Sequence, residues 1–141
     1  MIVNPAYIYY GKSEPLPDFN LWDGSVVNVP YALNNAEWSS FFKGFIVGAG
    51  GYVEFTVNSK GYNKFKINAY ADNVGGVRID IGFYNSSGSL ISTVSENITS
   101  PAKFYTVDIP NGAKMANAKI RINNTNGRYG MRIYSATLLQ E

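Results

Sequence analysis

Cysteine and histidine are both absent from the 141 residues of this chain. Without them the chain cannot form disulfide bonds, thiol nucleophiles, histidine general bases or the usual zinc sites. These absences remove most known designs of an enzyme active site, so we expect a non-enzymatic protein without a cofactor. A small hydrolase that uses paired carboxylates, such as Asp72 and Asp80, stays open as a less favoured alternative.

Charge and long apolar runs are also scarce. Charged residues make up 16% of the chain, and the formal net charge is +2. Proteins that bind nucleic acid usually have a concentrated basic excess, and a membrane-spanning helix needs about 20 apolar residues. The longest apolar candidate, residues 41–51, is interrupted by Lys43 and by glycines. We therefore expect no contact with nucleic acid or membrane, and residues 1–5 do not resemble a signal peptide.

Aromatic residues and glycine are abundant instead, with 11 tyrosines and 14 glycines. This composition is typical of strands joined by tight turns. Apolar and polar side chains alternate in residues 64–71 and 77–84, which predicts two strands with one apolar face each. Because the turn-rich residues 72–76 lie between them, the sequence predicts a hairpin. A lone hairpin is not stable in water, so a sheet is expected beside it and another across from it.

Similar alternation predicts further strands at regular spacing. The inward set switches within residues 131–139, which predicts a β-bulge near Tyr134 and Ser135 or burial on both faces. Residues 38–47 are predicted to form a short buried strand, and residues 124–127 the loop of the last hairpin. About eight strands and no helix predict an all-β fold, an antiparallel jelly-roll-like β-sandwich.

Residues 1–30 are predicted to form an extended arm that precedes a sandwich domain of residues 31–141. Proline lacks a backbone donor and biases the preceding residue toward extended geometry. The arm contains four prolines, namely Pro5, Pro15, Pro17 and Pro30.

The aromatic side chains of the arm need a surface to cover, because disordered segments are poor in such residues. They are Tyr7, Tyr9, Tyr10, Phe19 and Trp22. That surface is either the chain's own sandwich or a neighbouring subunit. The arm has one basic and three acidic residues, whereas the remainder has eleven basic and seven acidic residues. This difference in charge favours docking of the arm on the body, in cis or in trans.

The order of motifs from residue 38 to the C-terminus resembles a known fold. The motifs are GGYVEFTV, KFKINAYADNVGGVRIDIGFYNSSGSLIS, KFYTVDIPNGAKMANAKIRINN and NGRYGMRIYSATLLQE. They are similar to the galactose-binding-like jelly roll of many carbohydrate-binding modules, and to small sandwich domains of bacteriophage tail and head-surface proteins. The resemblance implies a fold more directly than an activity.

Two functions follow from this resemblance. We expect a phage virion accessory protein, decorating the head or belonging to the tail, that acts by protein–protein adhesion through its arm. Its partners would be further copies of this chain or other virion proteins. The alternative is a carbohydrate-binding module that recognises glycans through its loops.

Glycan binding requires aromatic rings that stack on a sugar, flanked by planar hydrogen-bonding side chains. The candidates are Trp22, Trp38, Tyr70, Asp72, Asn73, Arg78, Asn124, Asn126, Arg128 and Tyr129. The opposing interpretation places Trp38 in the core and assigns the Asn-rich loops to turn geometry.

Two further surface features are open to more than one interpretation. Basic side chains are expected to form an outward row, which is either a solvated face or a contact for an acidic partner. They are Lys64, Lys66, Arg78, Lys119, Arg121 and Arg132. Asp72, Asn73 and Asp108 offer oxygen ligands for calcium, but no spaced acidic loop is present, so no metal is expected.

Overall fold

The alternating segments of the sequence form strands in the structure, a computed structural model that describes residues 15–141. Eight strands within this range are six residues or longer: β4 (Tyr31–Ser39), β5 (Gly44–Val57), β6 (Lys64–Ala71), β7 (Val77–Tyr84), β8 (Leu90–Ile98), β9 (Lys103–Asp108), β10 (Ala118–Asn124) and β11 (Met131–Leu139). Three two-residue strands precede them: β1 (Phe19–Asn20), β2 (Trp22–Asp23) and β3 (Val26–Val27). The 3₁₀ turn η2 (Asn111–Ala113) lies between β9 and β10. The predicted all-β fold is confirmed.

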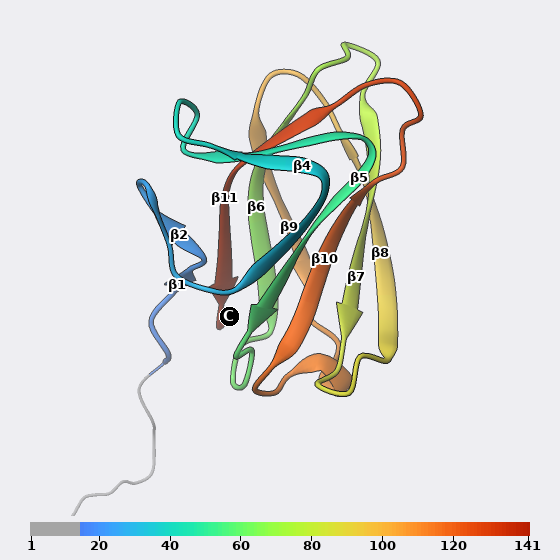
Figure 1. Ribbon diagram of the computed structural model, residues 1–141. Helices are drawn as coiled ribbons and strands as arrows, with labels where there is room; N and C mark the ends of the chain where they lie inside the picture. The colour runs from blue at the N-terminus through green and yellow to red at the C-terminus, as the bar shows by residue number, and fades with distance from the viewer. Residues whose placement is uncertain (1–14) are drawn as a thin grey trace, which may run out of the picture.

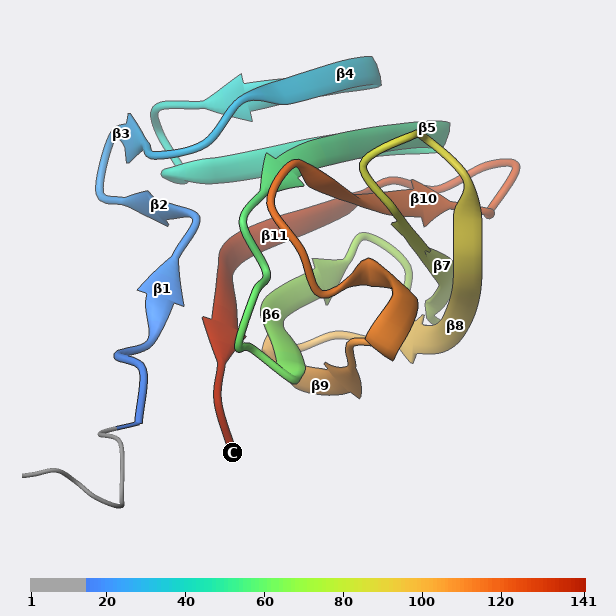
Figure 2. The same cartoon turned by 90° about the horizontal axis from the view of Figure 1, so that it is seen from below.

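One antiparallel sheet bends over to make both layers of a sandwich (Figures 1 and 2). Its order is β8-β7-β10-β5-β11-β6-β9, with β4 added on β5 and β1 added on β11. The long strand β5 joins the layers, because its first part pairs with β11 and its second part with β10. We call β8, β7, β10 and the second part of β5 the front layer, and β9, β6 and β11 the rear layer.

The core lies between the layers and contains mainly the inward side chains of β5, β6, β7, β10 and β11. Its largest fully buried side chains include Phe45, Phe55, Phe65 and Phe83. The rings of Phe65 on β6 and Phe83 on β7 meet edge to face, with centroids 6.4 Å apart. Each such side chain contributes about 1.5–3 kcal/mol through burial, so the core supplies the main stabilising term.

Strands β6 and β7 have the predicted bounds, but the prediction that they pair with each other as a hairpin is wrong. Strand β6 pairs with β9 and β11, whereas β7 pairs with β8 and β10. Residues 72–76 therefore connect the two layers, and the apolar faces of β6 and β7 meet across the core. Alternation determines which side chains are buried, but it does not determine which strands are neighbours.

The predicted strand over residues 38–47 is also wrong, because the chain turns within it. Strand β4 ends at Ser39, where the Oγ accepts a hydrogen bond from the Phe42 backbone N–H at 3.1 Å. Lys43 adopts a positive φ of 54°, and β5 then runs on without a break through Gly50 and Gly51. A Cβ on Gly51 would lie 2.5 Å from the Asn34 carbonyl oxygen, so glycine is needed where β4 bulges against β5.

The end of the chain agrees with one prediction and corrects another. The register of β11 against β6 shifts between Ile133 and Ser135, which confirms the predicted bulge. The predicted last hairpin is wrong, because β10 and β11 pair with different parts of β5 rather than with each other.

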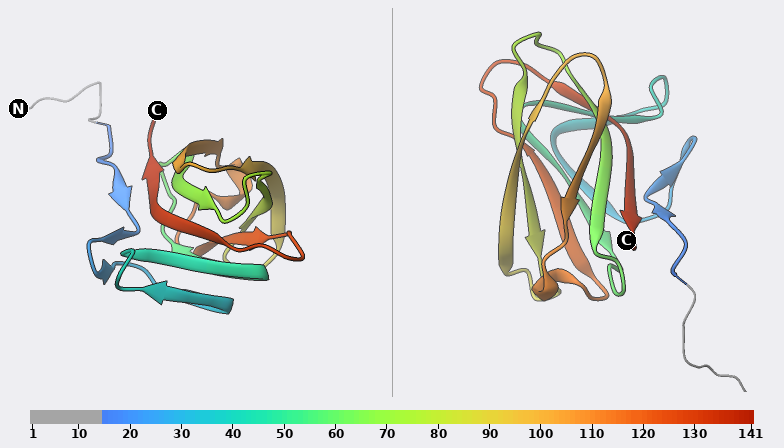
Figure 3. Two further views of the ribbon diagram at one scale, coloured as in Figure 1. Left: turned by 90° about the horizontal axis from the view of Figure 1, so that it is seen from above. Right: turned by 180° about the vertical axis from the view of Figure 1, so that it is seen from behind.

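Residues 15–30 cover the sandwich in cis. Strand β1 pairs with β11, and Leu21 and Trp22 are buried in the core. The Trp22 indole N–H donates to the Lys43 carbonyl at 2.9 Å, and its ring lies 5.0 Å from the Phe45 ring. Figure 3 shows this part of the arm beside β11. The contacts predicted for Tyr7, Tyr9 and Tyr10 lie outside the described residues.

Candidate functional site

The outward surface of the front layer combines aromatic rings with hydrogen-bonding side chains. Strand register places these side chains in neighbouring rows across β7, β10 and β5. One row contains Asp80, Asn123 and Tyr52, the next Gly82, Arg121 and Glu54, and a third Tyr84, Lys119 and Thr56. We call this surface the front face.

Arg121 lies at the centre of the front face and is held on several sides. Its Nε and Nη2 both donate to Oε2 of Glu54, at 3.0 and 2.8 Å. The guanidinium lies 4.0 Å from the ring centroid of Tyr52 and 5.6 Å from that of Tyr84. Partial burial acts to lower the pKa of Arg121, but the hydrogen bond and charge of Glu54 outweigh burial and raise it. A guanidinium held in this way is a fixed hydrogen-bonding group at the middle of the surface.

Gly82 creates the space in which the Tyr84 ring lies. A Cβ at position 82 would stand 3.1 Å from Cε1 of Tyr84 and 3.4 Å from its hydroxyl oxygen. The ring therefore folds back over the glycine. It lies next to Arg121, the residue of β10 that pairs with Gly82. A larger residue at this position would push the ring away from the guanidinium.

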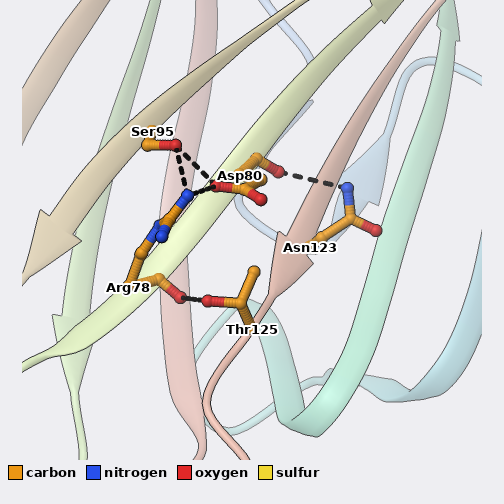
Figure 4. A network of polar contacts seen from close by, with 5 residues as sticks. All are labelled: Arg78, Asp80, Ser95, Asn123 and Thr125. Carbon is orange, nitrogen blue, oxygen red and sulfur yellow. Dashed lines mark hydrogen bonds and ion pairs between the residues drawn. The ribbon is translucent and has the colours of Figure 1, made fainter.

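Asp80 is the centre of a second polar group on the same face (Figure 4). Its Oδ1 accepts hydrogen bonds from the Ser95 hydroxyl at 2.7 Å and from Nη2 of Arg78 at 3.3 Å. The Asn123 side-chain amide donates to the Asp80 backbone carbonyl at 3.1 Å, which leaves its own side-chain oxygen pointing away from Asp80. Thr125 donates to the Arg78 backbone carbonyl at 2.8 Å. These contacts hold the side chains of the group in defined positions.

The front face offers the two kinds of contact that a polyhydroxylated ring requires. The Tyr52 and Tyr84 rings provide apolar surface, and the neighbouring carboxylate, amide and guanidinium groups provide planar donors and acceptors. Because hydrogen bonds and cross-strand neighbours already hold these groups, binding would cost little ordering of side chains.

The predicted candidates at the arm and at the rear layer lie away from the front face. Trp22 is 5% exposed, so its ring is not available to stack on a ligand. Tyr70 and Asp72 both contact Arg132 of β11, with the Tyr70 ring centroid 5.1 Å from the guanidinium carbon and an ion pair of 3.7 Å to Asp72. Hydrogen bonding by Tyr134 raises the pKa of Arg132, with Asp72 adding to the effect.

The predicted loop candidates mostly serve turn geometry. The Asn124 amide is buried and donates to the carbonyls of Val47 and Tyr129. Oδ1 of Asn126 accepts the backbone N–H groups of Arg128 and Tyr129, both at 2.8 Å.

Of two further candidates, one serves turn geometry and the other packs against the core. Asn73 donates to the Gly76 carbonyl at 3.3 Å, within its own turn. Trp38 packs against Phe45 with ring centroids 5.1 Å apart, as the core interpretation predicted. Of the predicted binding residues, only Arg78 is part of the front-face network.

The predicted outward row of basic residues is divided between two surfaces. Arg78, Lys119 and Arg121 lie on the front layer, and their counterparts on the rear layer are Lys64, Lys66 and Arg132. The calcium alternative is wrong for a similar reason, because Asp72 and Asp108 lie at opposite ends of β6 and Asp108 pairs with Lys64. Within residues 15–141, no group of three acidic residues is placed to hold a metal ion.

Tyr52, Glu54 and Tyr84 of the front face were not among the residues predicted from the sequence to bind a ligand. Alternation placed Glu54 and Arg121 on outward faces, which was the available signal. Glu54 and Arg121 are neighbours only because β10 lies between β5 and β7, and no local sequence pattern predicts this strand order.

No protein-family model matches the sequence, and no curated protein matches it. Solved structures do match. A variant of a family 29 carbohydrate-binding module superposes with a TM-score of 0.66 and 13% identity, covering 89% of this chain and 93% of that chain. This chain has the fold of that carbohydrate-binding module.

Parts of longer enzyme chains match as well. A family two carbohydrate esterase from Cellvibrio japonicus gives a TM-score of 0.57 at 12% identity, over 89% of this chain and 33% of the esterase chain. The Clostridium thermocellum xylanase with a family 22 module, solved with xylohexaose, gives 0.52 at 9% identity, over 70% of this chain and 22% of that chain. This chain therefore spans about a third of the esterase and less of the xylanase.

These neighbours overturn the expected phage virion protein. They are carbohydrate-binding modules or parts of enzyme chains named for action on carbohydrates. Within residues 15–30 the arm packs on its own sandwich, through the pairing of β1 with β11 and the burial of Leu21 and Trp22. Within residues 15–141, no helix is long and apolar enough to cross a membrane.

Proposed function

We propose that this protein is a non-enzymatic carbohydrate-binding module that holds a glycan on its front face. The observation that supports this most directly is the preassembled group of Tyr52, Glu54, Arg121 and Tyr84, which joins aromatic surface to fixed planar hydrogen-bonding groups. The Asp80 network extends the same surface toward β8.

The residue types of the front face add support. Alanine variants of a tyrosine, a lysine, an arginine and an aspartate were made in the family 29 module to probe ligand recognition. The front face presents tyrosine, lysine, arginine and aspartate side chains on adjacent strands. Acidic and basic groups are both present and largely paired, which favours a neutral glycan over a strongly charged one.

The test measures binding of the full chain to xylohexaose, cellohexaose, mannohexaose and a galactose-based oligosaccharide by isothermal titration calorimetry. We expect at least one of these neutral sugars to bind. Tyr84→Ala should weaken this binding roughly tenfold, because a contact that buries about 55 Å² of apolar surface at about 25 cal/mol per Å² contributes about 1.4 kcal/mol.

A matched control is available on the rear layer. Tyr70 resembles Tyr84 in being a half-buried tyrosine beside an arginine, 5.1 Å from Arg132 compared with 5.6 Å from Arg121. Tyr70→Ala should leave the affinity unchanged. Equal losses in the two variants, or no binding of any of the four sugars, would contradict the front-face assignment.

A further inference from the structure

A cleft of about 470 Å³ lies where the arm meets the outer surface of the rear layer, on the opposite side of the sandwich from the front face. One wall comes from the arm and includes Asp18, Asn20 and Asp23. The facing side is formed by the turn after β4 and by β6, β9 and β11. We call this the arm cleft. Its volume falls within the range of small-molecule sites, about 300–1,000 Å³.

Hydrogen bonds fix the arm wall in place. The Thr137 hydroxyl donates to Oδ1 of Asn20 at 2.9 Å, at the position where β1 pairs with β11. The Asn20 amide donates to Oδ1 of Asp23 at 3.3 Å, and the Asn28 amide donates to Oδ2 of the same carboxylate at 3.1 Å. The polar groups of this wall are therefore ordered by the fold itself.

Aromatic rings form much of the facing side. Phe42 and Tyr134 pack edge to face with centroids 6.3 Å apart, and both line the cleft. Phe104, on strand β9, also lines it and is 60% exposed. The ammonium of Lys66 lies 4.9 Å from the Phe104 ring centroid. An exposed phenylalanine at the rim of a polar cleft is well placed to stack on a ring-shaped ligand.

The charges of the lining cancel. Asp18 and Asp23 contribute two negative charges, and Lys43 and Lys66 contribute two positive charges. A site for phosphate or another anion would have an excess of basic groups, and a site for a cation would have an excess of acidic ones. The lining is therefore suited to a polar but uncharged ligand.

Asn68 is a polar residue beside the cleft whose side-chain oxygen is not used within the described part of the chain. It lies on β6 between Phe104 and Ser135, which both line the cleft. Its side-chain oxygen is buried and accepts no hydrogen bond from any residue in the range 15–141. Buried acceptors in native proteins are nearly always paired with protein or with ordered water, so this oxygen is an acceptor that the described residues leave unused beside the cleft.

From these observations we infer that the arm cleft is a second saccharide site, which takes one or two neutral sugar units of a glycan. Aromatic rings would cover the apolar face of the sugar, while Asn20 and the carboxylates of the arm would bind its hydroxyl groups. In this assignment the arm has a specific role, since it supplies one wall of the site. The inference shares with the proposed function only the class of ligand.

The test is a nuclear magnetic resonance titration of the ¹⁵N-labelled full chain with xylohexaose, cellohexaose and mannohexaose. We expect one of these sugars to shift the backbone amides of Lys66, Phe104 and Ser135. Phe104→Ala should weaken binding at these amides about tenfold, through the loss of one stacking ring. Shifts at Arg121 and Asn123 report the front face separately, and Phe104→Ala should leave them unchanged.

Phe41 provides the control. It lies next to Phe42 in the same turn, is 86% exposed, and does not line the cleft. Phe41→Ala should keep the shifts at the arm cleft. The second site is disproved if the three cleft amides do not move with any of the sugars, or if Phe41→Ala and Phe104→Ala have equal effects. Shifts of the front-face amides alone would disprove the second site and support the proposed function. Shifts of the cleft amides alone would support the second site and contradict the proposed function.

Discussion

At the scale of single residues, Gly82 controls the position of an aromatic ring on the front face. A Cβ there would already lie 3.1 Å from the Tyr84 ring, so the two further methyl groups of valine would displace it. Gly82→Val should therefore reduce affinity for the bound oligosaccharide about tenfold, close to the effect of Tyr84→Ala. Calorimetry on the two variants checks this, and combining them should cause no further loss. Additive losses would show that Gly82 acts by another route.

The ion pair between Lys64 and Asp108 should make the stability of the fold depend on pH. The hydrogen bond and charge of Lys64 lower the pKa of Asp108, and Asp108 in turn raises the pKa of Lys64. Because the folded pKa of Asp108 is lowered, its stabilising effect is present above the ordinary carboxyl pKa of about 4 and is lost as the pH falls through the folded value. A carboxyl ¹³C titration should show the lowered pKa.

Lys64→Gln should return the pKa of Asp108 to its ordinary range. Lys103→Gln, on the same strand as Asp108, is the control and should leave the titration unchanged. An unaltered Asp108 titration in Lys64→Gln would mean that the ion pair does not form in solution.

At the scale of elements, the close approach of β5 to β11 depends on Gly44, at the start of β5. A Cβ at this position would overlap the Ile133 carbonyl oxygen and would lie 3.2 Å from the Cα of Tyr134. Both contacts are with backbone atoms, which cannot rotate away. Gly44→Ala should lower the free energy of unfolding by about 1–3 kcal/mol, as measured by urea denaturation.

Gly127 offers a matched control for this measurement. A Cβ there meets no atom within 4 Å, so Gly127→Ala should stay within about 0.5 kcal/mol of the parent. If Gly44→Ala left the free energy of unfolding equally unchanged, the close approach of β5 to β11 would be contradicted.

The elements also show how much of this protein could be predicted from its sequence. The bounds of β6 and β7, their inward faces and the bulge after Ile133 follow from alternation, because a period of two assigns each side chain to a face. The pairing of these strands does not follow, since β6 and β7 look like a hairpin and yet belong to different layers.

The candidate site was predictable to the same extent as the fold. Glu54 and Arg121 were recognisable as outward residues, but their contact is a consequence of β5 lying next to β10. The loop asparagines were misleading as site candidates, because Asn124 and Asn126 use their side chains to hold the turn itself. Local patterns thus predicted faces, whereas the site is a property of strand order.

At the scale of the whole molecule, the two proposed sites lie on opposite outer surfaces of one sandwich. A molecule with two such sites can hold two polysaccharide chains at once, which joins them without any contact between protein copies. Mixing the protein with a long soluble polysaccharide that it binds should therefore raise the light scattering of the solution. Tyr84→Ala and Phe104→Ala should each shift this increase to about tenfold higher protein concentration, because each variant weakens one site and keeps the other intact. Undiminished cross-linking by both variants would mean that the chains are joined through association of the protein rather than through two sites in one molecule.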